Sequence, residues 1–319
     1  MRTIAILAFL AVTAIAPAHA QDAQGFPNRA VKIVVPFPAG GPTDVNMRIV
    51  GQKLSELWGQ GVVIENRPGA NTGIGAQQVA KSAPDGYTLL AAMDTTLVMN
   101  PATGTAMSYD PFKDFSVITL TAKNTSLLTV RGDGPKTIQE LIALGKTKKL
   151  NYGAGIIITR LAGATFAKAA GIEVQLIPYK GSSEVVQGLL TGSVDFIVDG
   201  IAPSLPLIRS GKFRALAKLN NRALPTLPEI KPLSEASGLK IDEMSSWIGL
   251  VAPAGTPPAV VQKIHDDVVR AMADASVADR LEKAGILAVT TTPQEFDKFF
   301  RDEVVRWTRV YKESGIKLD

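Results

Sequence analysis

The sequence predicts an α/β protein built from two units of similar size, each a mostly parallel sheet with helices on its faces. Two observations support this prediction. Short β-rich runs alternate with helix-like runs along most of the chain, and parallel sheets require that order because their crossovers are usually helices. The alternation also comes in two sets, and a late strand follows the second set.

The first set has the order βαβαβ and begins with the apolar strand 31–35. The helix that follows is indicated by apolar residues at helical spacing, which share one helix face. These residues are Met47, Val50, Leu54 and Leu57. The other elements of this set are expected at 62–64 (strand), 75–82 (helix) and 87–92 (strand).

The second set begins with strand 126–130 and a helix at 137–145. Thr137 is the expected N-cap of that helix, and Glu140 is placed to close a capping box with it. The remaining strands are expected at 150–153, 174–178, 195–199 and 213–219, and the remaining helices at 161–170 and 184–191.

The chain then returns to a strand at 247–252, followed by PAGTPP and a helix from Ala259. Pro257 and Pro258 suit a helix start, where a missing N–H costs nothing. Helices at 277–284 and 293–312 are expected to close the chain, and the proline-containing segment 220–239 is expected to be a surface connection.

The first twenty residues are interpreted as a secretory signal peptide, with cleavage after Ala20. Arg2 supplies a positive start, the apolar stretch 4–16 is too short to span a bilayer, and residues 18–20 form an A-x-A site. The mature chain is therefore expected in the periplasm, and we expect it to be a monomer.

The composition argues against several classes of protein. The chain has no cysteine, which excludes disulfides, thiol chemistry and thiolate metal sites. Its charges are interspersed without a Lys/Arg block, so nucleic-acid binding has little support. Only His265 remains after cleavage, and no G-x-S-x-G or H-E-x-x-H motif accompanies it. We expect no catalytic residue, cofactor or metal.

The loop PFPAGGPTD, residues 36–44, follows the first strand and leads into the first helix. Gly40 and Gly41 allow a tight turn and a close approach of the backbone to a ligand. Free N–H groups at a helix N-terminus bind anions, and the P-loop and dinucleotide motifs are both missing here. A carboxylate site is one interpretation of this loop, and a plain capped turn is the other.

Five further loops have a similar composition of glycine, serine, threonine and single charges where strands lead into helices. They are NRPGANTGIG (66–75), MDTTLVMN (93–100), YGAGIIITR (152–160), YKGSS (179–183) and VDGIAPS (198–204). Ligands of parallel sheets bind beyond the carboxyl ends of the strands. The six loops together therefore predict a cleft between the two units that holds a small ligand.

Several segments resemble the solute receptors of tripartite tricarboxylate transporters, also called Bug proteins. The segments that carry the resemblance are VKIVVPFPAGGPTD, VIENRPGAN, SAPDGYTLL, YDPFKDFSVITL, VQLIPYKGSSEVVQGLLTGSVDFIVDG, GKFRALA and SSWIGLVAPAGTP. The resemblance implies a two-domain periplasmic-binding-protein fold of type II, the Venus-flytrap kind, with the ligand in the interdomain cleft. It also implies that 21–122 and 242–319 form one domain, that 123–241 form the other, and that a membrane permease receives the ligand.

The resemblance further implies a small organic carboxylate gripped at the first loop, partly through ordered waters. The residues carried over for the first loop are Phe37, Ala39, Gly40, Gly41, Thr43 and Asp44. Those in the other loops are Thr95, Thr96, Gly153, Ile157, Thr159, Arg160 and Asp199. An Asx turn is the alternative role for Asp199.

This chain departs from the family pattern in the loop after Tyr152. Family members are usually rich in small polar residues there, whereas this chain has three isoleucines and then Thr159 and Arg160. If this loop lines the cleft, the isoleucines would form an apolar wall and Arg160 a bidentate carboxylate clamp. An aromatic dicarboxylate such as terephthalate or phthalate is then expected. In the alternative, the isoleucines pack internally and Arg160 lies on the surface. A second departure is GANTGIG, where the family often has GANGTIG.

The sequence is also compatible with two other functions. One is a periplasmic hydrolase or transferase that uses Asp44 or Asp199 as a base. The other is a carboxylate receptor that signals to a membrane sensor instead of supplying a permease.

Overall fold

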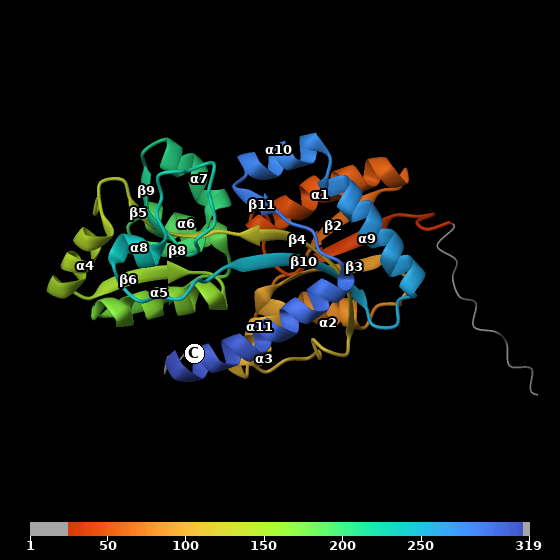
Figure 1. Ribbon diagram of the computed structural model, residues 1–319, viewed down its shortest axis with the longest axis horizontal. Coiled ribbons are helices and arrows are strands. Elements are labelled where there is room, and N and C mark those ends of the chain that lie inside the picture. The colour runs from red at the N-terminus through yellow and green to blue at the C-terminus, as the bar shows by residue number, and fades with distance from the viewer. Residues whose placement is uncertain (1–24, 315–319) are drawn as a thin grey trace, which may run out of the picture.

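Two separate sheets organise the computed structural model, which describes residues 25–314 (Figure 1). The expected signal peptide, residues 1–20, lies outside the described residues. The first sheet contains β1 (Val31–Val35), β2 (Val62–Asn66), β3 (Thr88–Met93), β4 (Phe115–Asn124), β10 (Ser246–Pro253) and β11 (Ile286–Ala288). The second sheet contains β5 (Ser126–Arg131), β6 (Leu150–Ala154), β7 (Val174–Pro178), β8 (Phe196–Gly200) and β9 (Phe213–Lys218).

The two sheets repeat one strand order. The first reads β2-β1-β3-β10-β4, with β11 added beside β4, and the second reads β7-β6-β8-β5-β9. In each sheet the first three strands are parallel, and the fourth is antiparallel to both of its neighbours. That fourth strand is in each case the one that follows the passage of the chain from the other sheet.

Helices cover both faces of the first sheet. One face packs α1 (Pro42–Trp58), α9 (Pro258–Met272) and α10 (Ala275–Lys283). The other packs α2 (Gly73–Ala80), the π-helical turn η1 (Thr95–Met99), α3 (Asn100–Thr103) and α11 (Pro293–Ser314). The strands supply apolar side chains to both faces, as expected for parallel strands buried on both sides. In β1, for example, Ile33 packs on the α1 side and Val34 on the α2 side.

The second sheet is covered in the same way. One side carries α4 (Ile138–Thr147) and α5 (Ile157–Ala170), and the other carries α6 (Ser182–Leu190) and α7 (Ile201–Arg209). The short helix α8 (Leu233–Ser237) lies in the segment expected to be a surface connection. None of the helices described between residues 25 and 314 combines the length and apolar character needed to cross a bilayer.

The chain passes between the sheets at two places that lie side by side. Asn124 ends β4 and Ser126 begins β5, while Ser246 begins β10 and pairs with Asn124. The amide of Asn220 joins the two passages by donating to the Thr125 hydroxyl at 3.2 Å and to the Ser245 hydroxyl at 3.1 Å. Such a pair of adjacent connections suits a hinge between two domains.

The structure confirms every strand that the sequence predicts, and two of them, 31–35 and 174–178, agree in both bounds. It adds β4, β11, η1, α3, α7 and α8, which the sequence analysis did not predict. The prediction for α5 was too short, since the helix begins at Ile157 and not at 161.

The N-cap of α4 was predicted correctly, whereas the capping box was wrong. The Thr137 hydroxyl accepts a hydrogen bond from the Glu140 N–H at 3.1 Å. The Glu140 carboxylate, however, accepts from the Lys136 N–H at 2.7 Å and not from Thr137. The carboxylate therefore reaches one residue further back than a capping box requires.

Candidate ligand-binding site

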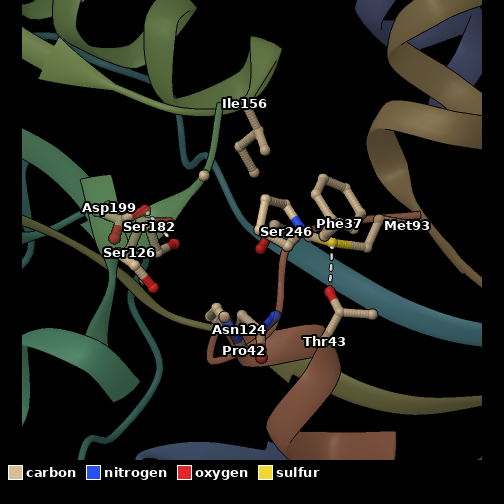
Figure 2. A pocket seen from close by; sticks show the side chains of 15 residues that line it. Phe37, Pro42, Thr43, Met93, Asn124, Ser126, Ile156, Ser182, Asp199 and Ser246 are labelled. Atoms are coloured by element: carbon tan, nitrogen blue, oxygen red, sulfur yellow. Dashed lines mark hydrogen bonds between the residues drawn. The ribbon is translucent and has the colours of Figure 1, made fainter. Parts of the chain in front are cut away.

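Two adjoining cavities lie where the carboxyl ends of the parallel strands face each other. The smaller has a volume of about 40 Å³, and the larger has a volume of about 450 Å³. Phe37, Pro38 and Ile156 belong to the walls of both. Figure 2 shows the smaller cavity, with Asp199 and Ser182 on one side and Thr43 and Met93 on the other.

All six of the glycine- and serine-containing loops contribute to these walls. The smaller cavity is lined by Phe37, Pro38, Gly41, Pro42, Thr43, Met93, Asn124, Ser126, Ile156, Gly181, Ser182, Ser183, Asp199, Gly200 and Ser246. The larger is lined by Pro36, Phe37, Pro38, Pro68, Gly69, Ala70, Asn71, Thr72, Thr95, Gly155, Ile156, Ile157, Arg160, Tyr179 and Lys180. The expectation of convergent loops therefore agrees with the walls of the two cavities.

Three helix N-termini reach the smaller cavity, those of α1, α6 and α7. Their N-caps are Gly41, Gly181 and Gly200, and no side chain caps any of the three. All three glycines line the cavity. The first-turn N–H groups are thus not occupied by capping side chains, and the helix dipoles add positive potential. This arrangement favours an anion.

The loops of the two sheets touch each other around the smaller cavity. A Cβ atom added at Gly181 would lie 3.2 Å from the Pro38 ring, and one at Gly200 would lie 3.0 Å from Cγ of Pro42. Larger residues at these two positions would push the loops apart. The left-handed backbone of Gly40, with φ of 84°, completes the tight turn of the first loop.

Asp44 is buried and holds the first loop in place. One carboxylate oxygen accepts from the Gly40 N–H at 3.0 Å and from Nε of Arg48 at 2.9 Å. The other accepts from the Asn66 amide at 3.0 Å. Burial by itself would raise the pKa of Asp44, but these hydrogen bonds outweigh it and leave the pKa below its ordinary value. The side chain faces its own loop and not the cavities.

Asp199 and Asn124 lie in the wall of the smaller cavity with polar atoms that lack partners. The Ser182 hydroxyl donates to Oδ1 of Asp199 at 2.9 Å, whereas Oδ2 of Asp199 has no partner among residues 25–314. Neither side-chain polar atom of Asn124 has one. Burial raises the pKa of Asp199 to about 7, and the hydrogen bonds from Ser182 and Gly200 only partly oppose this.

The larger cavity combines apolar walls with two cations. Ile156 and Ile157 line it, together with Arg160 and Lys180. The Arg160 guanidinium donates at 3.2 Å to the Gly155 carbonyl and at 3.4 Å to the Tyr179 carbonyl, and its buried Nε has no partner. Burial lowers the pKa of Arg160, although an arginine keeps its charge near neutral pH.

The structure divides the predicted site residues into two groups. Seven of them line a cavity: Phe37, Gly41, Thr43, Thr95, Ile157, Arg160 and Asp199. The other six are Ala39, Gly40, Asp44, Thr96, Gly153 and Thr159, and they belong to neither wall. Some of these hold in place residues that line a cavity. The Thr159 hydroxyl closes the first turn of α5 by donating to the Ile156 carbonyl at 2.9 Å. Gly153 leaves room for the Tyr179 ring, which would lie 2.9 Å from an added Cβ.

Asn124, Ser126 and Ser246 line the smaller cavity but were not predicted as site residues. All three lie at strand ends where the chain passes between the sheets, and the end of β4 at Asn124 carried no strand prediction. His265 lies on α9 and its Nε2 is 3.1 Å from the Thr291 carbonyl oxygen. It lines neither cavity, and residues 25–314 contain no group of three acidic or histidine side chains that could hold a metal ion.

Known proteins share this architecture. The family model described as "Tripartite tricarboxylate transporter family receptor" matches residues 46–316. BugT of Bordetella pertussis is 31% identical over 327 residues, which cover 99% of this chain and 98% of BugT.

Two solved structures are similar over almost their whole length. R. palustris Rpa4515 with adipate has a TM-score of 0.87 and 32% identity, and the match covers 91% of this chain and 99% of Rpa4515. MatC (Rpa3494) from Rhodopseudomonas palustris with bound malate has a TM-score of 0.82 and 30% identity, and the match covers 89% of this chain and 99% of MatC.

The two repeated sheets, the paired passages and the cavities between them define a two-domain solute-binding protein of the periplasmic-binding-protein class. Within this class, the chain belongs to the tripartite tricarboxylate transporter receptor family, which includes the Bug proteins. The resemblance noted in the sequence is thereby confirmed. The family is described as a receptor family, and the similar structure of BugD is described as a periplasmic binding protein.

Proposed function

We propose that this receptor captures a small organic carboxylate in the periplasm and delivers it to a tripartite tricarboxylate transporter permease. The observation that carries the proposal is the meeting of three uncapped helix N-termini at the smaller cavity. That arrangement stabilises an anion without a positively charged side chain. The adipate bound to Rpa4515 and the malate bound to MatC are both dicarboxylates, which supports the same ligand class.

We propose that two domains close around the ligand by a hinge motion. Residues 21–122 together with 242–319 would form one domain, and residues 123–241 would form the other. The mature chain would begin after Ala20, where the signal peptide is cleaved. The adjacent passages at Asn124–Ser126 and Ser245–Ser246 support this division, because rotation there would separate the two walls of the cavities. We propose that the receptor acts as a monomer.

The larger cavity suggests an aromatic dicarboxylate, such as terephthalate or phthalate. Its volume of about 450 Å³ lies within the usual range for small-molecule sites. Ile156, Ile157 and Phe37 offer apolar walls for a ring. Arg160 could then hold the second carboxylate through a forked pair of hydrogen bonds, since its two present contacts are long and its Nε is unpartnered.

A thermal-shift screen of the mature protein tests the ligand class. The panel contains terephthalate, phthalate, adipate, malate, citrate, glutamate and benzoate. A ligand at about 100 times its dissociation constant adds roughly 2.7 kcal/mol of stability, which raises the melting temperature visibly. We expect terephthalate or phthalate to give the largest shift. A larger shift with citrate or glutamate would contradict the aromatic ligand, and no shift from any carboxylate would contradict the receptor function. Recovery of the ligand unchanged distinguishes a receptor from a hydrolase or transferase.

The role of Arg160 can be separated from general attraction by charge. The substitution Arg160→Gln should weaken terephthalate binding by about 10- to 100-fold, because a pair of charged hydrogen bonds to the second carboxylate is lost. Benzoate, which lacks the second carboxylate, should lose little. The matched control is Lys180→Gln, which removes a cation from the same cavity wall. Isothermal titration calorimetry measures the affinity of the wild type and of both variants for the two ligands. Equal losses for terephthalate and benzoate would assign Arg160 a structural role.

A further inference from the structure

Within the described part of the chain, three buried polar atoms in the wall of the smaller cavity have no hydrogen-bond partner. They are Oδ2 of Asp199 and the two side-chain polar atoms of Asn124. Asp199 is 4% exposed and Asn124 is 2% exposed. Buried polar groups in native proteins are nearly always hydrogen-bonded, so these atoms require an occupant that pairs with them. The cavity of about 40 Å³ has room for a carboxylate group or a few waters.

A carboxylate ligand in the smaller cavity would be attracted by some groups of the wall and repelled by another. Three helix N-termini attract the anion, whereas the carboxyl group of Asp199 faces the same small space. If Asp199 were ionised, two negative charges would lie close together in a buried site, which is strongly unfavourable. Two carboxyl groups in one site avoid this repulsion when they share a proton.

Among the residues that the structure describes, Asp199 is the only ionisable one that lines the smaller cavity. The titratable groups on the surrounding elements are Asp44, Arg48, Lys53 and Glu56 on α1, Lys123 on β4, Arg131 on β5, Tyr152 on β6, Arg160 and Lys168 on α5, Tyr179 and Lys180 before α6, Glu184 on α6 and Arg209 on α7. Several of them are already engaged: Asp44 with Arg48, Arg131 with Asp133, and Glu184 with the Lys180 N–H.

We propose that Asp199 meets the ligand as a neutral carboxylic acid, so that capture of the carboxylate takes up one proton from solvent. Oδ2–H of Asp199 would donate to one oxygen of the ligand carboxylate, and Nδ2 of Asn124 would donate to the other. This inference rests on the proposed function. Because Asn124 ends β4 of the first sheet and Asp199 lies in β8 of the second, the ligand would link both domains.

The energetic cost of the proton is small near neutral pH. Burial raises the pKa of Asp199 to about 7, so the neutral acid is accessible near neutral pH before the ligand binds. A hydrogen bond from a neutral acid to a carboxylate is also short and roughly twice as strong as one between neutral groups. The linkage predicts that affinity is highest below pH 7 and falls as the acid ionises.

Calorimetry of the mature wild-type protein tests the proposal, with adipate and terephthalate as probes. Titrations at pH 7, 8 and 9 in two buffers of different ionisation enthalpy report the number of protons taken up. We expect close to one proton per ligand at pH 8, and an affinity that falls roughly tenfold per pH unit above pH 7. Binding without proton uptake at pH 8 would overturn the proposal.

Asp199→Asn is the matching variant, since the amide has the same shape and donates a hydrogen bond without titrating. It should bind the same ligands with an affinity that is nearly independent of pH, and without proton uptake. Asp94→Asn is the control, because burial also raises the pKa of Asp94 to about 7, yet Asp94 lines neither cavity. Its proton uptake on binding should equal that of the wild type.

The outcomes separate this inference from the proposed function. If the folded Asp199→Asn protein loses binding at every pH, Asp199 acts as an ionised acceptor and the inference is wrong. If the variant does not fold, the wild-type proton count still decides. If the wild type binds no carboxylate between pH 6 and pH 9, the proposed function itself fails.

Discussion

Asp44 illustrates how a residue can serve a binding site without lining it. The family resemblance implied that Asp44 would belong to the part of the first loop that grips the ligand carboxylate. In the structure, both of its oxygens are occupied by Gly40, Arg48 and Asn66. The carboxylate therefore fixes the loop that presents Phe37 and Thr43 to the cavities. A ligand contact by Asp44 stays a prediction, and its structural role has a separate test.

Asp44→Asn should destabilise the protein by about 1–3 kcal/mol at pH 7, because hydrogen bonds to a buried charge are lost. The pKa of Asp44 is lower in the folded protein than its ordinary value. Its contribution to stability is thus present above the unfolded pKa and is lost as the pH falls through the folded pKa. The difference between variant and wild type should shrink below about pH 4. Urea unfolding at pH 7, 5 and 3 measures it.

The exposed aspartate on α11 provides the control for that experiment. Asp302 pairs with Lys298 at the surface, and such pairs contribute little to stability. Asp302→Asn should leave the free energy of unfolding almost unchanged at all three pH values. Equal stability of Asp44→Asn and the wild type at pH 7 would show that the first loop does not depend on this carboxylate.

At the scale of elements, the site is made by helix N-termini that glycines bring close together. The N-cap residues of α1, α6 and α7 are all glycines, so no capping side chain covers these helix N-termini. Gly181 and Gly200 have ordinary backbone angles, with φ of −178° and −61°. The close approach of the loops therefore depends on the small size of these glycines and not on their backbone flexibility. A larger side chain at Gly200 would meet Pro42 and should therefore obstruct closure.

Gly200→Ala should weaken adipate binding about 5- to 30-fold, the equivalent of about 1–2 kcal/mol of crowding. The added Cβ would lie 3.0 Å from Cγ of Pro42, so the two loops would have to separate by a few tenths of an ångström. Gly61→Ala is the control, since its Cβ would make an ordinary 3.8 Å contact with Ala30. Calorimetry gives the affinities and thermal unfolding shows that both variants fold. Unchanged affinity of Gly200→Ala would mean that the loops need not touch when ligand is bound.

At the scale of the whole molecule, the paired passages between the sheets allow a rigid-body motion. Asn124, Thr125 and Ser126 on one passage lie against Ser245 and Ser246 on the other. Small changes of backbone angle there would move an entire sheet with its helices. The contacts of Pro38 with Gly181 and of Pro42 with Gly200 describe a closed arrangement of the two loops.

Small-angle X-ray scattering should show a smaller radius of gyration with saturating adipate than without it. The physical reason is that ligand contacts on both domains favour the closed state over the open one. The bulkier variant Gly200→Val, which obstructs the closed contact, should stay extended in adipate. Identical profiles of the wild type with and without ligand would argue against hinge closure.

Much of the architecture follows from local patterns. The strands, most of the longer helices and the Thr137 cap depend on side-chain periodicity and on hydrogen bonds a few residues apart, which a sequence displays directly. The first four residues of α5 were missed because Ile156 and Ile157 resemble a continued apolar loop, and the N-cap position is occupied by Ile156 instead of a polar residue. β4 was missed because no turn signal separates it from β5, which begins two residues later.

The residues alone were sufficient for the α/β class, for the family and for the six loops that line the two cavities. Which side chains of those loops reach a cavity depended on tertiary packing: Asp44 turns back to Arg48, whereas Arg160 and Asp199 line walls. The proximity of Asn124 to Asp199, 75 residues apart in the chain, arises only when the two sheets come together. Local interactions shape each strand and helix, but the site lies between sheets, and only long-range packing sets the distances across that gap.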